Sequence, residues 1–219
     1  MSSKKDIVRE LRNSIIKGEY KPGKRLTEIS LSRRFNVSRT PIREALSWLQ
    51  KEGFIEIIPA IGARVVKLSL KNVSDVYDIL ITLEGLASRL AANNLTNEQI
   101  DKLEEYHLMM MNALSKKNFD LTSELNIRFH RLIREATNNS YLVDLRINLR
   151  YLVDWFNSVF VFIHTQWEET LKEHRLIIDA FKTRNPALAE FVTREHFEGA
   201  KKRFLEYFGK DQQKDQQEE

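Results

Sequence analysis

Hydrophobic residues change their spacing near residue 69, and that change limits the folds open to this chain. From there almost to residue 219 they recur at steps of three and four, which places them on one face of an α-helix. Before residue 69, two short runs rich in β-branched residues, at 54–58 and 63–68, interrupt a similar helical pattern. The sequence therefore predicts a mainly α protein in two parts, of which only the first contains strands.

The first part, residues 1–69, has the signals of a winged helix-turn-helix domain. A one-sided helical pattern covers 5–17, and Thr27 and Ser38 are suitable N-caps for two further helices. The third helix is expected to end at Gly53, because glycine readily adopts the left-handed C-cap conformation. The two β-rich runs that follow predict a hairpin. Three helices and a hairpin in this order are typical of a winged DNA-binding domain.

The second part, residues 70–209, is expected to be an all-helical antiparallel bundle. Six helical patterns follow one another, separated by signals such as the capping box at Thr96 and Gln99. Residues 210–219 contain only Lys, Asp, Gln and Glu, so a disordered tail is predicted there. The six predicted helices span residues 73–94, 96–117, 120–136, 141–164, 166–184 and 186–208.

Charge is distributed unevenly between the two parts. The whole chain has 35 Lys and Arg against 31 Asp and Glu, whereas residues 1–69 alone have 15 against 7, a net charge of +8. Such a charge on a small domain favours a polyanionic partner such as DNA. The absence of cysteine excludes disulfides, thiolate zinc sites and cysteine nucleophiles. No apolar run approaches the ~20 residues that cross a membrane, so a soluble, cytoplasmic protein is expected.

The third predicted helix carries two arginines in positions suited to reading DNA. Arg39 and Arg43 are four residues apart, so both project from the outward side near its N-terminal end. Pro41 fits there because the amides of a first helical turn have no partner within the helix. Arginine can bond both acceptors of a guanine edge, whereas Ser38 and Thr40 suit phosphate oxygens. Taken alone, the arginine pair could also be ordinary surface charge.

The tip of the predicted hairpin is a second candidate contact with DNA. Ile61 and Gly62 lie at the turn, and Arg64 follows it. A small residue and a cation both suit the narrow minor groove. The basic domain, the arginine pair and the hairpin occur together in the order that a winged DNA-binding domain needs, which favours DNA binding over a solvated charged face.

One set of residues in the first part carries a resemblance to a known family. The set is Gly18, Pro22-Gly23, Leu26-Thr27-Glu28, Val37 to Leu46, Leu49, Glu52-Gly53, Pro59 and Gly62-Ala63. Through these residues the first part resembles the DNA-binding domain of the GntR family of bacterial transcription regulators, and the whole chain resembles its FCD subfamily. The resemblance implies a homodimer on a pseudo-palindromic operator, with Arg39 and Arg43 as base readers. It also implies that the tip of the predicted hairpin, the wing of the domain, lies in the minor groove.

One stretch departs from the family pattern. Some relatives have an arginine in the second helix that also contacts DNA, where this chain has Ile29 and Ser30. The sequence therefore predicts that this contact is absent or is replaced by Arg33 or Arg34.

All five histidines lie outside the basic domain, and three of them can form one site. Asn126 and His130 are four residues apart, so both project from one side of their helix beside its apolar face. His174 and His196 have similar positions on two later helices. Imidazoles from facing helices, together with one oxygen, suit zinc, nickel or another divalent ion. From spacing alone, separate structural histidines remain an alternative.

The FCD resemblance implies a divalent metal, zinc or nickel, at Asn126, His130, His174 and His196. FCD domains typically hold a metal with an aspartate and a histidine in D-x-x-F-H-like spacing and a histidine from each of two later helices. Here Asn126 replaces the aspartate, and an amide oxygen brings no charge, so weaker metal binding is expected. The two other histidines, His107 and His164, fit no ligand pattern and are expected to be structural.

The same resemblance implies a small organic acid as effector, bound beside the metal. Many relatives have an arginine on the first bundle helix where this chain has Leu80, so a less acidic or more apolar ligand, or a purely structural metal, stays open. The expected function is a ligand-responsive transcription regulator, more often a repressor in this family, that the effector releases from its operator.

Two alternatives from other classes remain. One is a metal-dependent hydrolase fused to a DNA-binding domain, but the chain has no His-Glu-x-x-His helix, nucleophile elbow or phosphate-binding glycine loop. Glu173 and Glu195 each precede a histidine and so project about 100° away from it around the helix. The chain is therefore not expected to be an enzyme. The other alternative is a constitutive architectural DNA-binding protein that needs no ligand.

Overall fold

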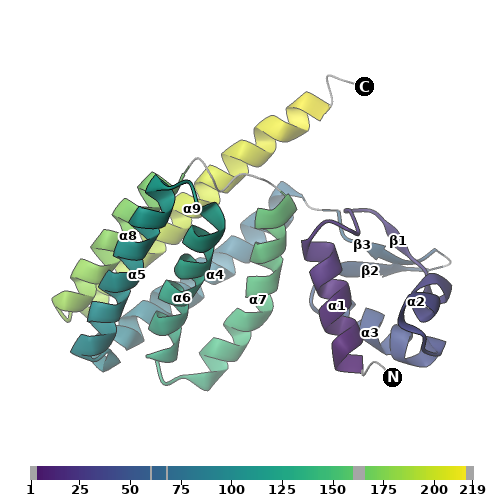
Figure 1. Ribbon diagram of the computed structural model, residues 1–219, viewed down its shortest axis with the longest axis horizontal. Coiled ribbons are helices and arrows are strands. Elements are labelled where there is room, and N and C mark those ends of the chain that lie inside the picture. The colour runs from purple at the N-terminus through teal and green to yellow at the C-terminus, as the bar shows by residue number, and fades with distance from the viewer. Residues whose placement is uncertain (1–3, 60, 68, 160–165, 216–219) are drawn as a thin grey trace. The chain divides into compact units, whose positions relative to one another are not determined.

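The computed structural model is mainly α-helical with one small sheet in its N-terminal part, which confirms the fold class expected from the sequence (Figure 1). No helix among the described residues is long and apolar enough to cross a membrane. The structure describes residues 4–59, 61–67, 69–159 and 166–215.

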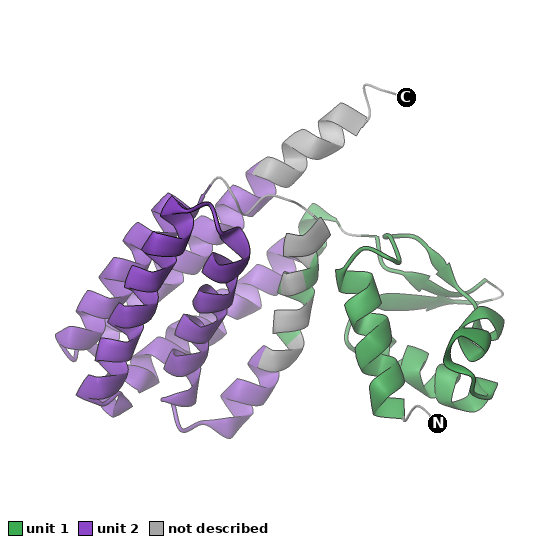
Figure 2. Ribbon diagram, in the orientation of Figure 1, with its two compact units in different colours: residues 1–72, 148–161 green, residues 73–147, 162–219 purple. Residues whose placement is uncertain are grey.

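Contacts within the chain define two units (Figure 2). Unit 1 combines the first 72 residues with residues 148–161, and unit 2 is the remainder. The sequence analysis divides the chain after residue 69, whereas the first segment of unit 1 ends at residue 72. The sequence places 148–161 in the helical part because the helical period there is unbroken. In the structure the buried ring of Trp155 lies 5.4 Å from the ring of Phe54, a contact between residues far apart in the sequence.

Unit 1 contains the helices and strands of a winged helix-turn-helix domain. They are α1 (Lys4–Ile16), β1 (Arg25–Leu26), α2 (Glu28–Phe35), α3 (Arg39–Lys51), β2 (Ile55–Ile58) and β3 (Gly62–Val65). The sheet is antiparallel in the order β1-β3-β2, and Ile57 pairs with Ala63 across the wing. The two-residue β1 is not predicted, because two residues cannot show a period. The helices bury their apolar faces around Leu11, Ile42 and Leu49.

Local caps explain where α2 and α3 begin and end. As predicted, Thr27 caps α2, its hydroxyl accepting a hydrogen bond from the amide of Ser30 at 3.2 Å. Ser38 precedes α3 as predicted, but its side chain makes no capping hydrogen bond and is exposed. Gly53 after α3 and Gly62 in the wing have φ of +81° and +95°, a region that favours glycine.

Unit 2 is built from helical segments that agree closely with the predicted ones. They belong to α4 (Leu70–Asn94), α5 (Asn97–Ser115), α6 (Phe119–Glu135), α7 (Ser140–Val159), α8 (Trp167–Lys182) and α9 (Pro186–Asp215). α5 packs against α6 and α8, and α8 packs against α9 (Figure 1). The predicted capping box is present, with Thr96 and Gln99 bonded to each other's backbone amides. The end of the fourth predicted helix, at 160–164, lies outside the described residues.

The last helix is longer than the sequence predicts. α9 continues through Asp215, so the backbone of residues 210–215 is helical where a disordered tail is expected. Four of these six residues are Lys or Gln, which have good helix propensity and let the helix continue without an apolar face. The rest of the predicted tail, 216–219, lies outside the described residues.

Candidate metal centre and nucleic-acid interface

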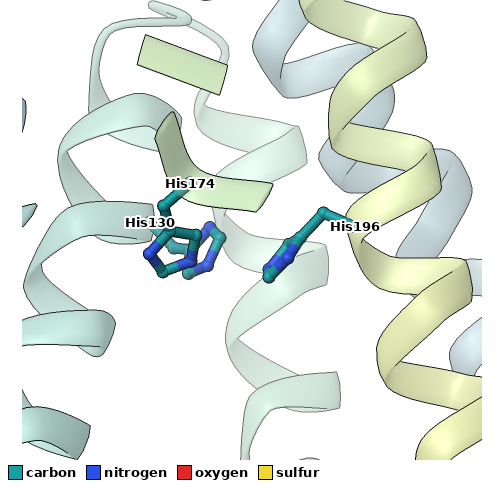
Figure 3. A group of neighbouring side chains, drawn as sticks. All are labelled: His130, His174 and His196. Atoms are coloured by element: carbon teal, nitrogen blue, oxygen red, sulfur yellow. The ribbon is translucent and has the colours of Figure 1, made fainter. Parts of the chain in front are cut away.

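Three histidines from three helices meet inside unit 2 (Figure 3). His130 on α6, His174 on α8 and His196 on α9 each offer a ring nitrogen, and these nitrogens all lie within 4.8 Å of one another. All three side chains are buried, and their ring centroids are 4.9 to 5.2 Å apart. The fold therefore brings together the three histidines that the sequence singled out, in an arrangement that can hold a metal ion.

His174 lies deepest in this cluster and lacks hydrogen-bond partners. Its side chain is fully buried, and neither Nδ1 nor Nε2 has a hydrogen-bond partner among the described residues. Its ring stacks on Phe129, with centroids 4.5 Å apart and planes 14° apart, which fixes its orientation. A buried polar atom without a partner destabilises a fold by about 1 to 3 kcal/mol. The donor set therefore fits a metal ion that accepts one of these lone pairs.

His196 is oriented by Glu173, a carboxylate that the sequence did not link to it. Its Nδ1 lies 2.7 Å from Oε2 of Glu173, and the two carboxylate oxygens of Glu173 also accept hydrogen bonds from Arg203 at 2.6 and 3.0 Å. Burial raises the pKa of Glu173, but the hydrogen bonds from His196 and Arg203 outweigh it and hold the pKa below its ordinary value. An ionised Glu173 places the His196 proton on Nδ1 and leaves Nε2 as the electron-pair donor.

The other two imidazoles are held in their neutral form. Burial, reinforced by the neighbouring histidines, lowers the pKa of His130 and His174 well below its ordinary value. Neutral imidazole is the form that binds metal, because protonation removes the lone pair. The interior of unit 2 therefore keeps both rings ready for a cation at neutral pH.

Asn126 is the fourth residue of the predicted metal site. It lies one turn before His130 on α6, and its Oδ1 is buried without a hydrogen-bond partner among the described residues. An amide oxygen in this state is available to a cation. His107, buried on α5, is not part of the three-histidine cluster, and burial lowers its pKa. His164 lies outside the described residues.

A buried group of charges lies in the same unit. Glu84 on α4 accepts hydrogen bonds from Nη1 of Arg134 at 3.0 Å and from Nε of Arg146 on α7. These three buried residues together comprise one carboxylate and two guanidiniums, so positive charge is in formal excess among them. Nη1 of Arg146 has no hydrogen-bond partner in the part of the chain that the structure describes. After burial and the neighbouring histidines, these arginines also lower the pKa of His130.

On unit 1, the predicted DNA-reading residues of α3 are exposed. Ser38, Arg39, Thr40 and Arg43 all lie at the N-terminal end of α3 on the solvent side. Nε of Arg43 donates a hydrogen bond to Oε1 of Glu28 on α2 at 2.8 Å, and this pair was not expected from the sequence. One feature of the sequence is consistent with this pair: Glu28 is the first residue of α2, the helix that precedes α3.

The three predicted DNA contacts in the wing, the hairpin formed by β2 and β3, differ in their exposure to solvent. Ile61 and Gly62 are exposed at the turn between β2 and β3. Arg64 is half-buried, and its Nε and Nη2 donate to Oε1 of Glu56 on β2 at 3.0 and 2.8 Å. Arg64 can therefore reach DNA only by exchanging or sharing this contact.

The two arginines considered as substitutes in α2 differ in their surroundings. Arg34 donates to the hydroxyls of Tyr20 at 2.7 Å and Ser14 at 3.1 Å, and its guanidinium lies over the rings of Tyr20 and Phe35. This network holds Arg34 against the end of α1 and the turn that follows it. Arg33 is exposed and has no ion-pair or hydrogen-bond partner within the described residues. Of the two, Arg33 has the side chain available to DNA.

Comparisons with known proteins agree with this architecture. Residues 3–65 match the gntR family of bacterial regulatory proteins, and residues 75–199 match the FCD domain. The HTH-type transcriptional regulator YdhC of Bacillus subtilis is 31% identical, over 86% of this chain and 84% of its own. The HTH-type transcriptional repressor RspR of Escherichia coli is also 31% identical, over 88% and 84%. The structure of E. coli McbR/YncC has the same fold, with a TM-score of 0.71 at 21% identity over 95% of this chain and 99% of that chain.

The fold and these matches define a DNA-binding transcription regulator. The chain belongs to the GntR family of bacterial regulatory proteins and carries an FCD domain. The families and the named relatives are transcriptional regulators and not enzymes, which confirms the expectation that the chain is not an enzyme and sets aside the hydrolase alternative.

Proposed function

We propose that the chain is a ligand-responsive repressor that binds a pseudo-palindromic operator as a homodimer and senses a small organic acid at a metal-containing site in unit 2. The observation that carries this proposal is the group of three buried imidazoles in an FCD domain, in which the His174 nitrogens have no hydrogen-bond partner within the described part of the chain. A purely structural cluster of histidines would be expected to satisfy those nitrogens within the fold.

On DNA, α3 would lie in the major groove. Arg39 and Arg43 would bond guanine edges, while Ser38 and Thr40 would contact phosphates. Their exposure at the N-terminal end of α3 supports these roles. The wing residues Ile61, Gly62 and Arg64 would enter the adjoining minor groove. Two copies are needed because two half-sites of a pseudo-palindrome require two recognition helices.

In unit 2, His130, His174 and His196 would hold zinc or nickel, with Asn126 as an oxygen ligand. The three imidazoles suit first-row divalent ions, and the buried, unpartnered Oδ1 of Asn126 supports its inclusion. Such an ion supplies positive charge that attracts an organic acid. Glu173 would fix the ring of His196 through Nδ1.

The effector would be an anion. The group formed by Glu84, Arg134 and Arg146 has a positive excess, and Nη1 of Arg146 has no hydrogen-bond partner among the described residues. Leu80, at the position where many relatives have an arginine, is fully buried and apolar. Arg146 on α7 therefore offers the cation that the Leu80 position lacks.

Three measurements test this function. A duplex selected by the protein from a random DNA library should bind wild type in a gel shift, and Arg43→Ala should lose that binding while circular dichroism and size-exclusion chromatography show a folded dimer. Elemental analysis should find zinc or nickel in the purified protein. Thermal shift should then identify organic acids that bind the protein, and a gel shift should show that these acids release the duplex.

Each result also has a contrary outcome. Unchanged affinity of Arg43→Ala would overturn the assignment of α3 as the recognition helix. A duplex that no metal or organic acid releases would favour the constitutive architectural alternative.

A further inference from the structure

Glu28 and Arg43 form an exposed contact beside the recognition helix. Glu28 is the first residue of α2, and Arg43 lies in the second turn of α3. Nε of Arg43 is 2.8 Å from Oε1 of Glu28, and the side chains are 33% exposed for Glu28 and 65% exposed for Arg43. The hydrogen bond from Arg43 is the main reason why the pKa of Glu28 lies below its ordinary value, so the carboxylate is charged at neutral pH.

The contact uses one edge of the guanidinium and leaves the other free. Glu28 is bonded through Nε, whereas Nη1 and Nη2 of Arg43 have no partner among the described residues. A guanine presents two acceptors, O6 and N7, to a pair of guanidinium N–H groups. The pair that remains on Arg43 matches this requirement.

The backbone of Glu28 is fixed at the start of α2. It follows Thr27, whose hydroxyl caps α2 by accepting from the amide of Ser30. A carboxylate in the first turn of a helix is also stabilised by the helix dipole. The backbone position of Glu28 is therefore set by α2, and from there its carboxylate accepts the hydrogen bond from Arg43.

We propose that Glu28 is a positioning residue for DNA specificity, which holds Arg43 with its terminal nitrogens directed to a guanine and disfavours its contact with phosphate. The inference rests on the proposed function that α3 reads DNA. A free arginine loses side-chain entropy when it binds a base, and a preformed contact reduces that loss. The nearby negative charge repels phosphate, so Arg43 gains little from nonspecific contacts.

Arg39 provides an internal contrast. It is exposed near the same end of α3 and has no hydrogen bond or ion pair with any described residue, although its charge also helps to lower the pKa of Glu28. Without a hydrogen bond to a carboxylate, Arg39 can exchange between bases and phosphates. The base pair read by Arg43 should therefore be specified more strictly than the one read by Arg39.

The test uses a duplex selected by the full-length wild-type protein and its single base-pair variants. Removal of the contact in Glu28→Ala should lower discrimination at the base pair read by Arg43 by about tenfold. Affinity for a random duplex should rise, and the slope of log K against log salt should steepen by about one unit as Arg43 moves to a phosphate. Glu28→Gln keeps an acceptor oxygen and should retain most of the discrimination, while its affinity for the random duplex rises.

A matched control is Glu44→Gln. Glu44 is adjacent to Arg43 on α3, but its carboxylate lies 3.4 Å from Nζ of Lys4. This variant removes the same charge from the same part of α3 but about 100° away from Arg43 around the helix, so selected and random duplexes should gain affinity equally. In an Arg43→Ala background, Glu28→Ala should leave discrimination unchanged, because the residue acts through Arg43.

Three outcomes would overturn the inference. Tighter binding of the selected duplex by Glu28→Ala, with unchanged discrimination, would show that the ion pair only competes with DNA. Equal loss of affinity for both duplexes together with a lower Tm would show a structural role. If the wild type selects no sequence at all, the proposed function itself fails, which is distinct from both results.

Discussion

Nδ1 of His196 on α9 lies 2.7 Å from Oε2 of Glu173, the residue that precedes His174 on α8. One helix thus contributes an imidazole to the cluster and also a carboxylate that orients an imidazole of its neighbour. Because Arg203 holds both oxygens of Glu173, the carboxylate cannot turn freely, and Nε2 of His196 remains the donor for a cation. The cluster is therefore organised before any ion binds.

Glu173→Gln should weaken metal binding without unfolding unit 2. The amide can no longer fix the Nδ1 proton of His196 as an ionised carboxylate does, and loss of such a partner lowers metal affinity about 10- to 100-fold. Competition with a chromophoric chelator for Zn²⁺ and Ni²⁺ measures this change. Glu169→Gln, on the exposed side of the same helix, is the matched control and should bind both ions as wild type does. Equal affinities in all three proteins would remove Glu173 from the site.

His174→Ala should lose bound metal, since the variant removes the ring whose two nitrogens have no hydrogen-bond partner among the described residues. Elemental analysis of the purified variant measures this directly. His107→Ala also removes a buried imidazole, but one outside the cluster, and should retain the metal content of wild type. Equal metal content in His174→Ala and wild type would mean that the ion is held elsewhere.

The sequence predicts the members of the histidine cluster but not their supporting contacts. Helical spacing places His130, His174 and His196 at the border of apolar faces, and such borders meet when helices pack. The same reasoning predicts that Glu173 projects about 100° away from His174. It cannot show that Glu173 then meets His196, because that contact depends on how α8 packs against α9.

The same limit applies to charges that pair over long separations. Glu84, Arg134 and Arg146 lie on three different helices, and only their packing shows that they form one buried group. In unit 1, a residue that reads as a candidate DNA contact, Arg34, is instead bound to Tyr20 and Ser14. Sequence pattern alone does not reveal such partners.

Arg34→Ala and Arg33→Ala should therefore have opposite effects. Loss of the hydrogen bonds to Tyr20 and Ser14 should lower the free energy of unfolding by about 1 kcal/mol and leave base discrimination unchanged. Arg33→Ala should leave stability unchanged and weaken DNA binding, with a smaller salt slope if Arg33 contacts a phosphate. Urea unfolding and gel shifts over a range of salt concentrations measure both. A stable Arg34→Ala variant that has lost discrimination would reverse the assignment.

The metal-free protein should lose stability as the pH falls below about 6.5, the ordinary pKa of histidine. Burial keeps His130 and His174 neutral in the folded state, whereas the unfolded chain takes up protons at both. Since the unfolded state then binds more protons, the free energy of unfolding falls by up to about 1.4 kcal/mol per pH unit for each histidine. Above that pH both states are neutral and the contribution is constant.

Urea unfolding at pH 7.5, 6.5 and 5.5 in the presence of a chelator measures this dependence. His174→Leu removes one of the two groups, so its loss of stability between pH 6.5 and 5.5 should be smaller than in wild type. Parallel curves for the two proteins would show that folding does not lower the pKa of His174.

Asn126→Asp should tighten metal binding by about tenfold or more, because it adds a negative charge to a neutral donor set of three imidazoles and an amide. In wild type, the charge of a divalent ion adds to the positive excess of Arg134 and Arg146, so an anion and the metal should strengthen each other's binding. The aspartate partly neutralises that charge. Calorimetric titration with Zn²⁺, with and without acetate, should therefore show a larger acetate effect in wild type than in Asn126→Asp. Weaker Zn²⁺ binding by Asn126→Asp would exclude this side chain from the ligand set.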